Sequence, residues 1–371
     1  MARGEGASLS SDRSAAKAAF LDANGFGDVR REALSGDAST RAYERLHRPD
    51  GSTLIFMDQP PKAETPACPP DATPEQRIAL GFNAAYRLAA GRVDAFVACA
   101  RHLKSLGLSA PTILAFDAAQ GLAVLEDLGD GLFAAEIAAG ANEVQLYDAA
   151  VDALLVLHAA PTPDTLAYGD VDWPLLTYDD LALKMAQDLL VEWLPKLRTE
   201  LSFDARAIAE WDALWAPIRQ RAEAGASVFC HRDYHAENLL WLPAREGPAR
   251  VGLIDFQDAV KAHPAWDFSM LLHDARRQVT PDLEERCIAR YLAARPQIDA
   301  AQFRADFAAL GALNTCRIIG IFARLVIRDG KPRYEAFLPR LWGYLDRTLA
   351  EPSMGPLKTW LDANVPLEAR R

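Results

Sequence analysis

The stretch HRDYHAENLLWL, residues 231–242, and the stretch VGLIDFQDA, residues 251–259, together decide how this chain folds. They set out an aspartate, Asp233, an asparagine five positions later, Asn238, and a second aspartate, Asp255, after an apolar run. Phosphoryl transfer needs such a trio, because one carboxylate faces the attacking hydroxyl while an amide oxygen and another carboxylate hold Mg²⁺ against nucleotide phosphates. The order predicts a kinase in which Asp233 is the catalytic base and Asn238 and Asp255 are the metal ligands.

Two other interpretations of these stretches compete. The polar residues could be an ordinary loop before a strand, but an Asp-x4-Asn order followed by an apolar strand and Ile-Asp-Phe is seldom accidental. Alternatively, His231, Asp233 and His235 alternate along the chain and could bind zinc in a hydrolase. No second histidine pair has helical spacing, and a zinc site leaves Asn238 and Asp255 without a role. The kinase interpretation accounts for more of the residues.

The bulk properties of the chain narrow the classes of function. Its 371 residues exceed a single typical core, which favours two lobes. The net charge of -11 disfavours nucleic-acid and anionic-membrane partners. The five cysteines are scattered without a CxxC pair, and the first twenty residues lack an apolar signal region. An apolar stretch over residues 308–327 contains two arginines and is expected to be a buried helix. We expect a cytoplasmic monomer that binds neither nucleic acid nor membrane.

The order of predicted elements indicates an α+β class and a two-lobed, protein-kinase-like fold. A helix is predicted over residues 12–35, and RAYERLHR and STLIFMD flank the turn RPDG as a β-hairpin. A helix over residues 94–105 and two strands around residues 119–121 follow, whereas amphipathic helices dominate after Gly131. We therefore predict a small β-rich nucleotide-binding lobe over residues 1–127. A larger helical lobe with the catalytic loop and substrate site follows over residues 128–371.

Two segments of the first lobe are predicted to contact the nucleotide. GDASTRAY, residues 36–43, supplies small hydroxyl residues and a cation that could cover the phosphates, although a plain turn would look the same. VLEDLGD, residues 124–130, leaves a strand and ends at a glycine, as a connection between lobes would. The predicted nucleotide-binding residues are Ser39, Thr40, Arg41, Glu126, Asp127 and Leu128.

Substrate contacts are expected from the second lobe. The candidates are His235 in the catalytic loop, Trp173 in the loop GDVDWPLL, and Arg317 inside an apolar helix. For Arg317 a buried salt bridge remains an equal alternative. In HPAWDF, residues 263–268, Asp267 is expected to accept hydrogen bonds from backbone amides of the catalytic loop.

With these residues in place, the chain resembles the aminoglycoside phosphotransferase-like kinases, a branch of the protein-kinase fold, over most of its length. It is most similar to the bacterial kinases of cell-wall sugars that phosphorylate the anomeric hydroxyl of N-acetylmuramate and N-acetylglucosamine. IFMDQPP, residues 55–61, and the run over residues 316–334 carry this closer likeness. The resemblance implies ATP and Mg²⁺ as cofactors, a small sugar as substrate and a role in peptidoglycan recycling.

One departure from the kinase pattern leaves alternatives open. The strand lysine that grips the nucleotide phosphates should lie near residues 57–58, where the sequence has Met and Asp. Arg41, Arg45 or Lys62 could replace it. An aminoglycoside or choline-type phosphotransferase remains an alternative, and so does a nucleotide-binding pseudokinase scaffold.

Overall fold

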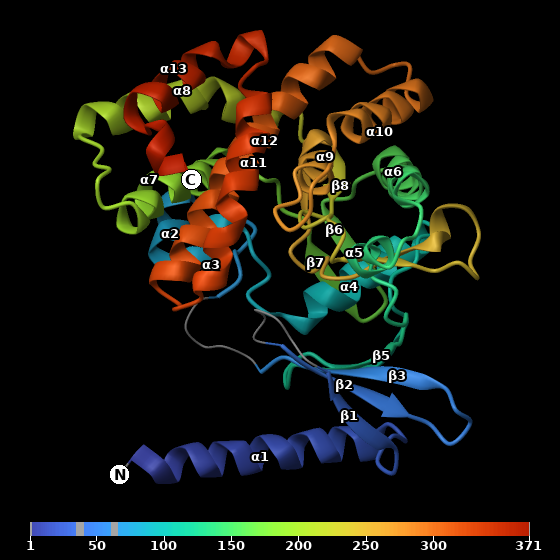
Figure 1. Cartoon of the computed structure of the whole chain (residues 1–371). Helices are drawn as coiled ribbons and strands as arrows, with labels where there is room; N and C mark the ends of the chain where they lie inside the picture. Colours follow the sequence, from blue (N-terminus) through green and yellow to red (C-terminus); the bar gives the residue numbers. More distant parts are fainter. Residues whose placement is uncertain (1, 35–40, 61–65, 371) are drawn as a thin grey trace.

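The structure, a computed structural model, describes residues 2–34, 41–60 and 66–370, with side chains from residue 12 onward. It confirms the α+β class and the kinase-like arrangement, in which a five-stranded antiparallel sheet lies beside a larger body of helices (Figure 1). The sheet has the order β1-β2-β3-β5-β4. Its strands are β1 (Arg30–Leu34), β2 (Ala42–His47), β3 (Thr53–Asp58), β4 (Ile113–Asp117) and β5 (Leu122–Glu126).

Both predicted hairpins are confirmed. Strands β2 and β3 pair antiparallel across the RPDG turn, where Gly51 has a φ of +84° that favours glycine. Strands β4 and β5 likewise pair across the turn that ends at Gly121, which has a φ of +69°. The hairpins supply four of the five strands of the sheet.

The predicted helix over residues 12–35 is wrong in its last part. Helix α1 (Ala2–Ala23) ends before Gly25, whose φ is +81°. The next residues, RREAL, form the edge strand β1, in which Arg30 lies opposite His47 of β2. Their helix propensity is overridden because a strand here pairs with residues 43–47 of β2.

Helix α1 covers one face of the sheet and leaves the other face to the rest of the molecule (Figure 1). Alternate strand residues point to opposite faces of a sheet, so the core under α1 uses every second position of β3. Charged pairs border this core, since Arg13 and Lys17 of α1 both bind Asp58. The core consists of Phe20, Leu21, Leu46, Leu54, Phe56, Leu122 and Val124.

Three helices connect the two sheet hairpins, namely α2 (Pro74–Leu80), α3 (Phe82–Tyr86) and α4 (Val93–Ser105). The α4 bounds agree with the predicted helix over residues 94–105. Arg77 is fully buried and, together with Arg87, binds Asp179, the residue just before helix α7 (Asp180–Leu197). The connecting segment is thus tied to the helical body, and the division of the chain at residues 127 and 128 remains a prediction.

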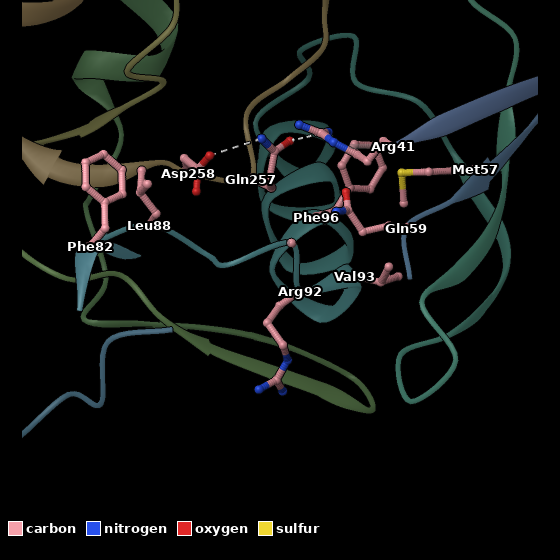
Figure 2. A pocket seen from close by; sticks show the side chains of 11 residues that line it. Arg41, Met57, Gln59, Phe82, Leu88, Arg92, Val93, Phe96, Gln257 and Asp258 are labelled. Atoms are coloured by element: carbon pink, nitrogen blue, oxygen red, sulfur yellow. Dashed lines mark hydrogen bonds between the residues drawn. The ribbon is translucent and has the colours of Figure 1, made fainter. Parts of the chain in front are cut away.

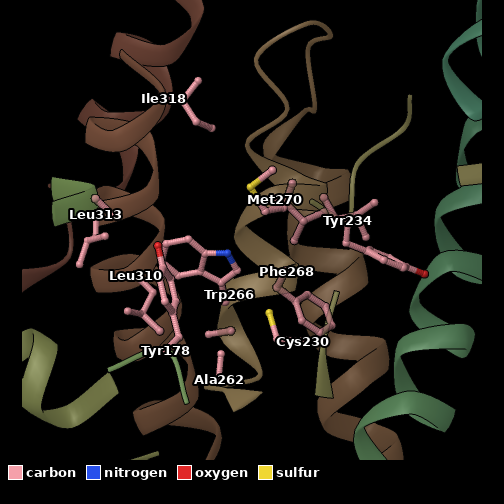
Figure 3. Packing of buried hydrophobic residues seen from close by; sticks show 14 of the residues in the cluster. Tyr178, Cys230, Tyr234, Ala262, Trp266, Phe268, Met270, Leu310, Leu313 and Ile318 are labelled. Carbon is pink, nitrogen blue, oxygen red and sulfur yellow. The ribbon is translucent and has the colours of Figure 1, made fainter. Parts of the chain in front are cut away.

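The helical body surrounds the catalytic stretch. Helix α9 lies between α11 and the segment that carries Tyr234, with Trp266, Phe268 and Met270 in the packed layer (Figure 3). The helices are α5 (Phe133–Ala138), α6 (Glu143–Ala159), α7 (Asp180–Leu197), α8 (Ala205–Ala224), α9 (Ala265–Leu272), α10 (Pro281–Ala294), α11 (Ala300–Ile327), α12 (Leu338–Thr348) and α13 (Gly355–Asn364). The short strands are β6 (Thr165–Tyr168), β7 (Val171–Pro174), β8 (Val228–Cys230), β9 (Leu239–Trp241), β10 (Val251–Leu253) and β11 (Val260–Ala262).

Helix α11 contains the apolar stretch that the sequence marks over residues 308–327. Within the described residues it is the helix that is long and apolar enough to cross a membrane, with a mean hydropathy of 1.6 over 18 residues. However, 67% of that window is buried inside the molecule, where α11 packs against α7, α9 and α12. It is the central core helix of this body.

Candidate active site

Two short antiparallel ribbons bring the predicted metal ligands together. Strands β9 and β10 pair with Leu239 opposite Leu253, so the residues just before β9 and just after β10 are neighbours. The backbone N–H of Ile254 donates to the carbonyl oxygen of Asn238 at 3.2 Å, and Asp255 follows directly. The second ribbon, β8 with β11, anchors the chain immediately before the catalytic loop.

The catalytic loop is held from beneath by buried hydrogen bonds. Asp267 of α9 accepts from the backbone N–H groups of His231 at 2.8 Å and Arg232 at 2.9 Å, which confirms the role predicted for it. Burial opposes ionisation of Asp267, but hydrogen bonds and the neighbouring histidines keep its pKa below the usual value. The Tyr234 hydroxyl donates to the carbonyl oxygen of Ala150 on α6 at 2.8 Å. These bonds fix the loop so that Asp233 points away from the core.

The backbone is strained at two positions of the site. Arg232 has a φ of +78° and Asp255 a φ of +63°, values that non-glycine residues seldom adopt and that cost about 1–3 kcal/mol each. The guanidinium of Arg232 is buried and donates to the carbonyl oxygens of Tyr86 at 2.9 Å and Arg87 at 3.1 Å. Such strain persists where surrounding contacts over-determine the backbone, and it is typical of functional sites.

A cavity of about 1090 Å³ lies between the sheet and the helical body. It brings together nine of the twelve residues that the sequence predicts for the site. Of the other three predicted residues, Ser39 and Thr40 lie outside the described residues, and the third is Trp173. The nine are Arg41, Glu126, Asp127, Leu128, Asp233, His235, Asn238, Asp255 and Arg317.

Trp173 does not belong to this group. It lies on β7, partly buried against the core, with the guanidinium of Arg92 5.7 Å from its ring centroid. Among the described residues that line the cavity, none belongs to β7. The geometry therefore separates Trp173 from the other predicted substrate residues.

One end of the cavity has the features of an adenine pocket. Leu128 follows β5, and within the described part of the chain neither its N–H nor its carbonyl oxygen has a hydrogen-bond partner. The N–H of Glu126, in contrast, donates to the carbonyl oxygen of Thr112 at 2.8 Å. Apolar side chains line the cavity near Leu128, and the sequence analysis did not predict them. The alternation of residues along β3 and β5 could have identified those that lie on these two strands. The whole set is Leu34, Ile55, Leu125, Leu240 and Ile254.

Side chains of the predicted hinge have structural partners. The carboxylate of Asp127 binds Nε of Arg45 at 2.7 Å and accepts from the N–H of Gly129 at 2.9 Å. Burial would raise the pKa of Asp127, but hydrogen bonds from Thr53, from the N–H of Gly129 and from Arg45, together with the Arg45 charge, lower it. Arg45 also binds Asp130 at 2.6 Å. The Asp127 side chain is therefore committed to contacts within the protein.

The Asn238 and Asp255 side chains offer oxygens that suit a hard cation such as Mg²⁺. Nδ2 of Asn238 donates to the carbonyl oxygen of Asp233 at 2.9 Å, which turns the amide so that Oδ1 is available on the other side. Asp255 binds Arg41 and accepts from Nε2 of Gln257 at 3.1 Å. Burial opposes its ionisation, but Arg41 and Gln257 lower its pKa, so the carboxylate is charged. The residues fit the predicted metal.

The acceptor end of the cavity lies beside Asp233. Nη2 of Arg317 is 3.7 Å from Oδ1 of Asp233, and its Nη1 donates to Oδ1 of Asn314 at 3.0 Å. Arg276 binds Glu237 of the catalytic loop at 2.8 Å. Sequence reasoning gave no substrate role to a further set of lining residues, which lie in the last turn of α9, in the segment after it and on α11. They are Met270, His273, Asp274, Arg276, Ile318, Ile321 and Phe322.

The histidines take other positions than a zinc site requires. His231 is fully buried and packs edge-on against the rings of Tyr234 and Phe256. Nε2 of His235 lies 3.3 Å from Nδ2 of Asn238, at the cavity wall. Over residues 2–34, 41–60 and 66–370, no three His, Cys, Asp or Glu side chains gather closely enough to hold a metal.

Comparisons with known proteins agree with this geometry. The model of the phosphotransferase enzyme family, APH, matches residues 30–303. An N-acetylmuramate/N-acetylglucosamine kinase of Caulobacter vibrioides is 68% identical over 363 residues, which cover 98% of this chain and 99% of that protein. The Pseudomonas putida protein of the same name is 28% identical over 88% of this chain and 86% of its own length. A choline/ethanolamine kinase family protein from Mesorhizobium loti shares the fold, with a TM-score of 0.54 at 16% identity over 94% of this chain and 99% of that chain. The chain therefore belongs to the phosphotransferase enzyme family, APH.

Proposed function

We propose that this chain is a sugar kinase that transfers the γ-phosphoryl group of ATP to the anomeric hydroxyl of N-acetylmuramate and N-acetylglucosamine during cell-wall recycling. The observation that carries a kinase is the convergence of Asp233, Asn238 and Asp255 on one cavity beside an apolar pocket. The two acceptor sugars are inferred from the name of the Caulobacter vibrioides relative. Its 68% identity over 98% of this chain supports the same acceptors here.

Asp233 would act as the catalytic base. Its side chain is partly exposed to the cavity, while the residues on either side of it are held in the core. The carboxylate accepts the proton of the acceptor hydroxyl as that oxygen forms a bond to the γ-phosphorus, and the bond from phosphorus to the ADP oxygen breaks. The transition state of this transfer is loose, so positioning of the hydroxyl matters more than strong basicity. An anomeric hydroxyl is more acidic than an ordinary alcohol and suits a carboxylate base.

Asn238 and Asp255 would hold Mg²⁺, which would supply positive charge to offset the negative charge that develops on the transferring phosphoryl group. Asn238 is fixed by its Nδ2 hydrogen bond to Asp233, so the base and the metal ligand share one rigid loop. Leu128 offers backbone groups to the adenine edge. Ile55 and Leu240 line the pocket on the sheet side and the helical side of the base.

The test is an acceptor screen with the purified protein, Mg²⁺ and ATP, with phosphorus NMR to locate the new phosphate. We expect an anomeric phosphate on both sugars, and we expect Asp233→Asn to lower kcat by about 10²–10⁴-fold with little change in ADP binding. Asp170→Asn is the matched control, because Asp170 is an exposed carboxylate whose side-chain partner among the described residues is Arg101.

Two outcomes would overturn the proposal. A new phosphate only on an aminoglycoside or on choline would select a different acceptor class for the same site. Binding of ADP without turnover of any acceptor, and without a difference between the wild type and Asp233→Asn, would make the chain a nucleotide-binding scaffold.

A further inference from the structure

An apolar side chain lies where kinases have a lysine on the third strand, and apolar residues of the following helix face it. Kinases of this fold pair a lysine of the third strand with a glutamate of the following helix. In this protein Met57 is the buried β3 residue that faces away from α1, whereas Asp58 binds α1 through Arg13. Phe96 and Val93 of α4, both apolar, line a cavity of about 430 Å³ together with Met57 (Figure 2).

The apolar replacement is built into the core. Phe96 stacks on Phe256 with ring centroids 4.8 Å apart and an interplanar angle of 29°. Phe256 directly follows Asp255, so this aromatic contact ties the turn that carries Asp255 to α4. Neither Met57 nor Phe96 can supply charge to nucleotide phosphates.

Arg41 supplies a cation at the corresponding place. It lies one residue before β2, beside the pair of Tyr43 and Met57, and its side chain is only 13% exposed. Its Nη2 binds Oδ1 of Asp255, and its Nη1 donates to Oε1 of Gln257 at 2.9 Å. Figure 2 shows the Arg41 side chain directed at Gln257, which in turn binds Asp258. The Arg41 side chain thus reaches from the edge of the sheet to the turn that contains Asp255 and Gln257.

Three other arginines line the cavity of about 1090 Å³, and each has carboxylate partners other than Asp255. Arg45 binds Asp127 and Asp130 at the hinge end, and Arg276 binds Glu237 of the catalytic loop. Arg317 lies at the acceptor end, 3.7 Å from Asp233. Arg41 is the one of these four that contacts Asp255.

We propose that Arg41 grips the nucleotide phosphates in place of the missing strand lysine, and that these phosphates exchange for part of its contact with Asp255. The inference rests on the proposed function of the cavity as a kinase site. If Asp255 holds Mg²⁺ and the same ion binds the nucleotide phosphates, Asp255 lies close to these phosphates. The guanidinium of Arg41, which contacts Asp255, then also lies close to them. A guanidinium can bind phosphate oxygens through two parallel hydrogen bonds, which a strand lysine cannot do.

The experiment compares the binding of ADP and of adenosine by calorimetry, in the presence of Mg²⁺, for the wild type, Arg41→Met and Arg41→Lys. A residue that grips phosphates should matter for ADP alone. We expect Arg41→Met to raise the Kd for ADP by about 10- to 100-fold and to leave that for adenosine unchanged. Arg41→Lys should recover part of the loss, because it keeps the charge but not the paired hydrogen bonds.

Two control variants sharpen the result. Arg45→Met removes a cation from the same strand and should change ADP and adenosine binding by the same factor, since Arg45 supports the hinge. Lys62→Met should leave ADP binding unchanged. The inference is overturned if Arg41→Met binds ADP as the wild type does, or if Lys62→Met shows the selective loss instead. If sugar turnover is intact in that case, the kinase proposal survives; if the wild type binds neither nucleotide nor sugar, both fail.

Discussion

The contact between helices α7 and α11 yields a prediction in which two effects of one methyl group oppose each other. Gly320 lies in the middle of α11, and a Cβ atom there would be 2.3 Å from both the backbone carbon and the backbone oxygen of Leu189 on α7. Real Cβ atoms do not approach other atoms so closely. In Gly320→Ala, therefore, one helix must shift relative to the other.

The magnitudes decide the sign. Alanine in a helix interior is favoured over glycine by about 1 kcal/mol. Overpacking of a core costs about 1–3 kcal/mol, and the upper part of that range applies here because the atoms struck belong to a backbone that cannot rotate away. We expect a net destabilisation of about 2 kcal/mol. Gly343→Ala is the matched control: Gly343 lies in α12, where an added Cβ would meet no described atom outside its own helix within 4 Å, so alanine should stabilise the protein by about 0.5–1 kcal/mol.

The assay is urea unfolding of the three proteins followed by tryptophan fluorescence, with the midpoints compared at equal slopes. Arg317 lies three residues before Gly320 on α11, so a shift of that helix should also raise the KM for sugar more than the KM for ATP. The reasoning is refuted if Gly320→Ala unfolds at the same or a higher urea concentration than the wild type while Gly343→Ala shows its expected gain.

Two further predictions concern charged groups. The pKa of Asp179 is lowered, because hydrogen bonds from buried Arg77 and from Arg87 outweigh its burial. This contribution to stability is therefore present above the unfolded pKa of about 3.9 and is lost as pH falls through the lower folded value. Asp179→Asn should cost about 3 kcal/mol at neutral pH, and urea midpoints should show the gap to the wild type closing below about pH 4; a pH-independent gap would contradict the ion-pair account. Arg317→Ala should raise the KM for N-acetylmuramate, which carries a lactyl carboxylate, about 10-fold more than that for N-acetylglucosamine. Steady-state kinetics with both sugars measure this, and equal losses would mean that the Arg317 charge serves the structure alone.

Local patterns in the chain predicted most of what lies within a few residues of the catalytic loop. Asp233 and Asn238 share one loop, so their spacing alone keeps them near each other, and the apolar run before Asp255 indicated a buried strand whose end holds that carboxylate. The same local reasoning placed Asp267 under the loop correctly. It extended the first helix too far, because pairing with β2 outweighs the helix propensity of residues 30–34.

The sequence by itself determined the fold class and the trio Asp233, Asn238 and Asp255, because these depend on alternation, turns and spacing within about twenty-five residues. Only the tertiary structure decided how the cavity is completed. It brings Arg41 to Asp255 across 214 positions of the chain, and it leaves Trp173 on β7 away from the cavity. The physical reason is that such contacts depend on how the sheet packs against the helices. Side-chain burial over the whole molecule sets that packing, and no local spacing encodes it.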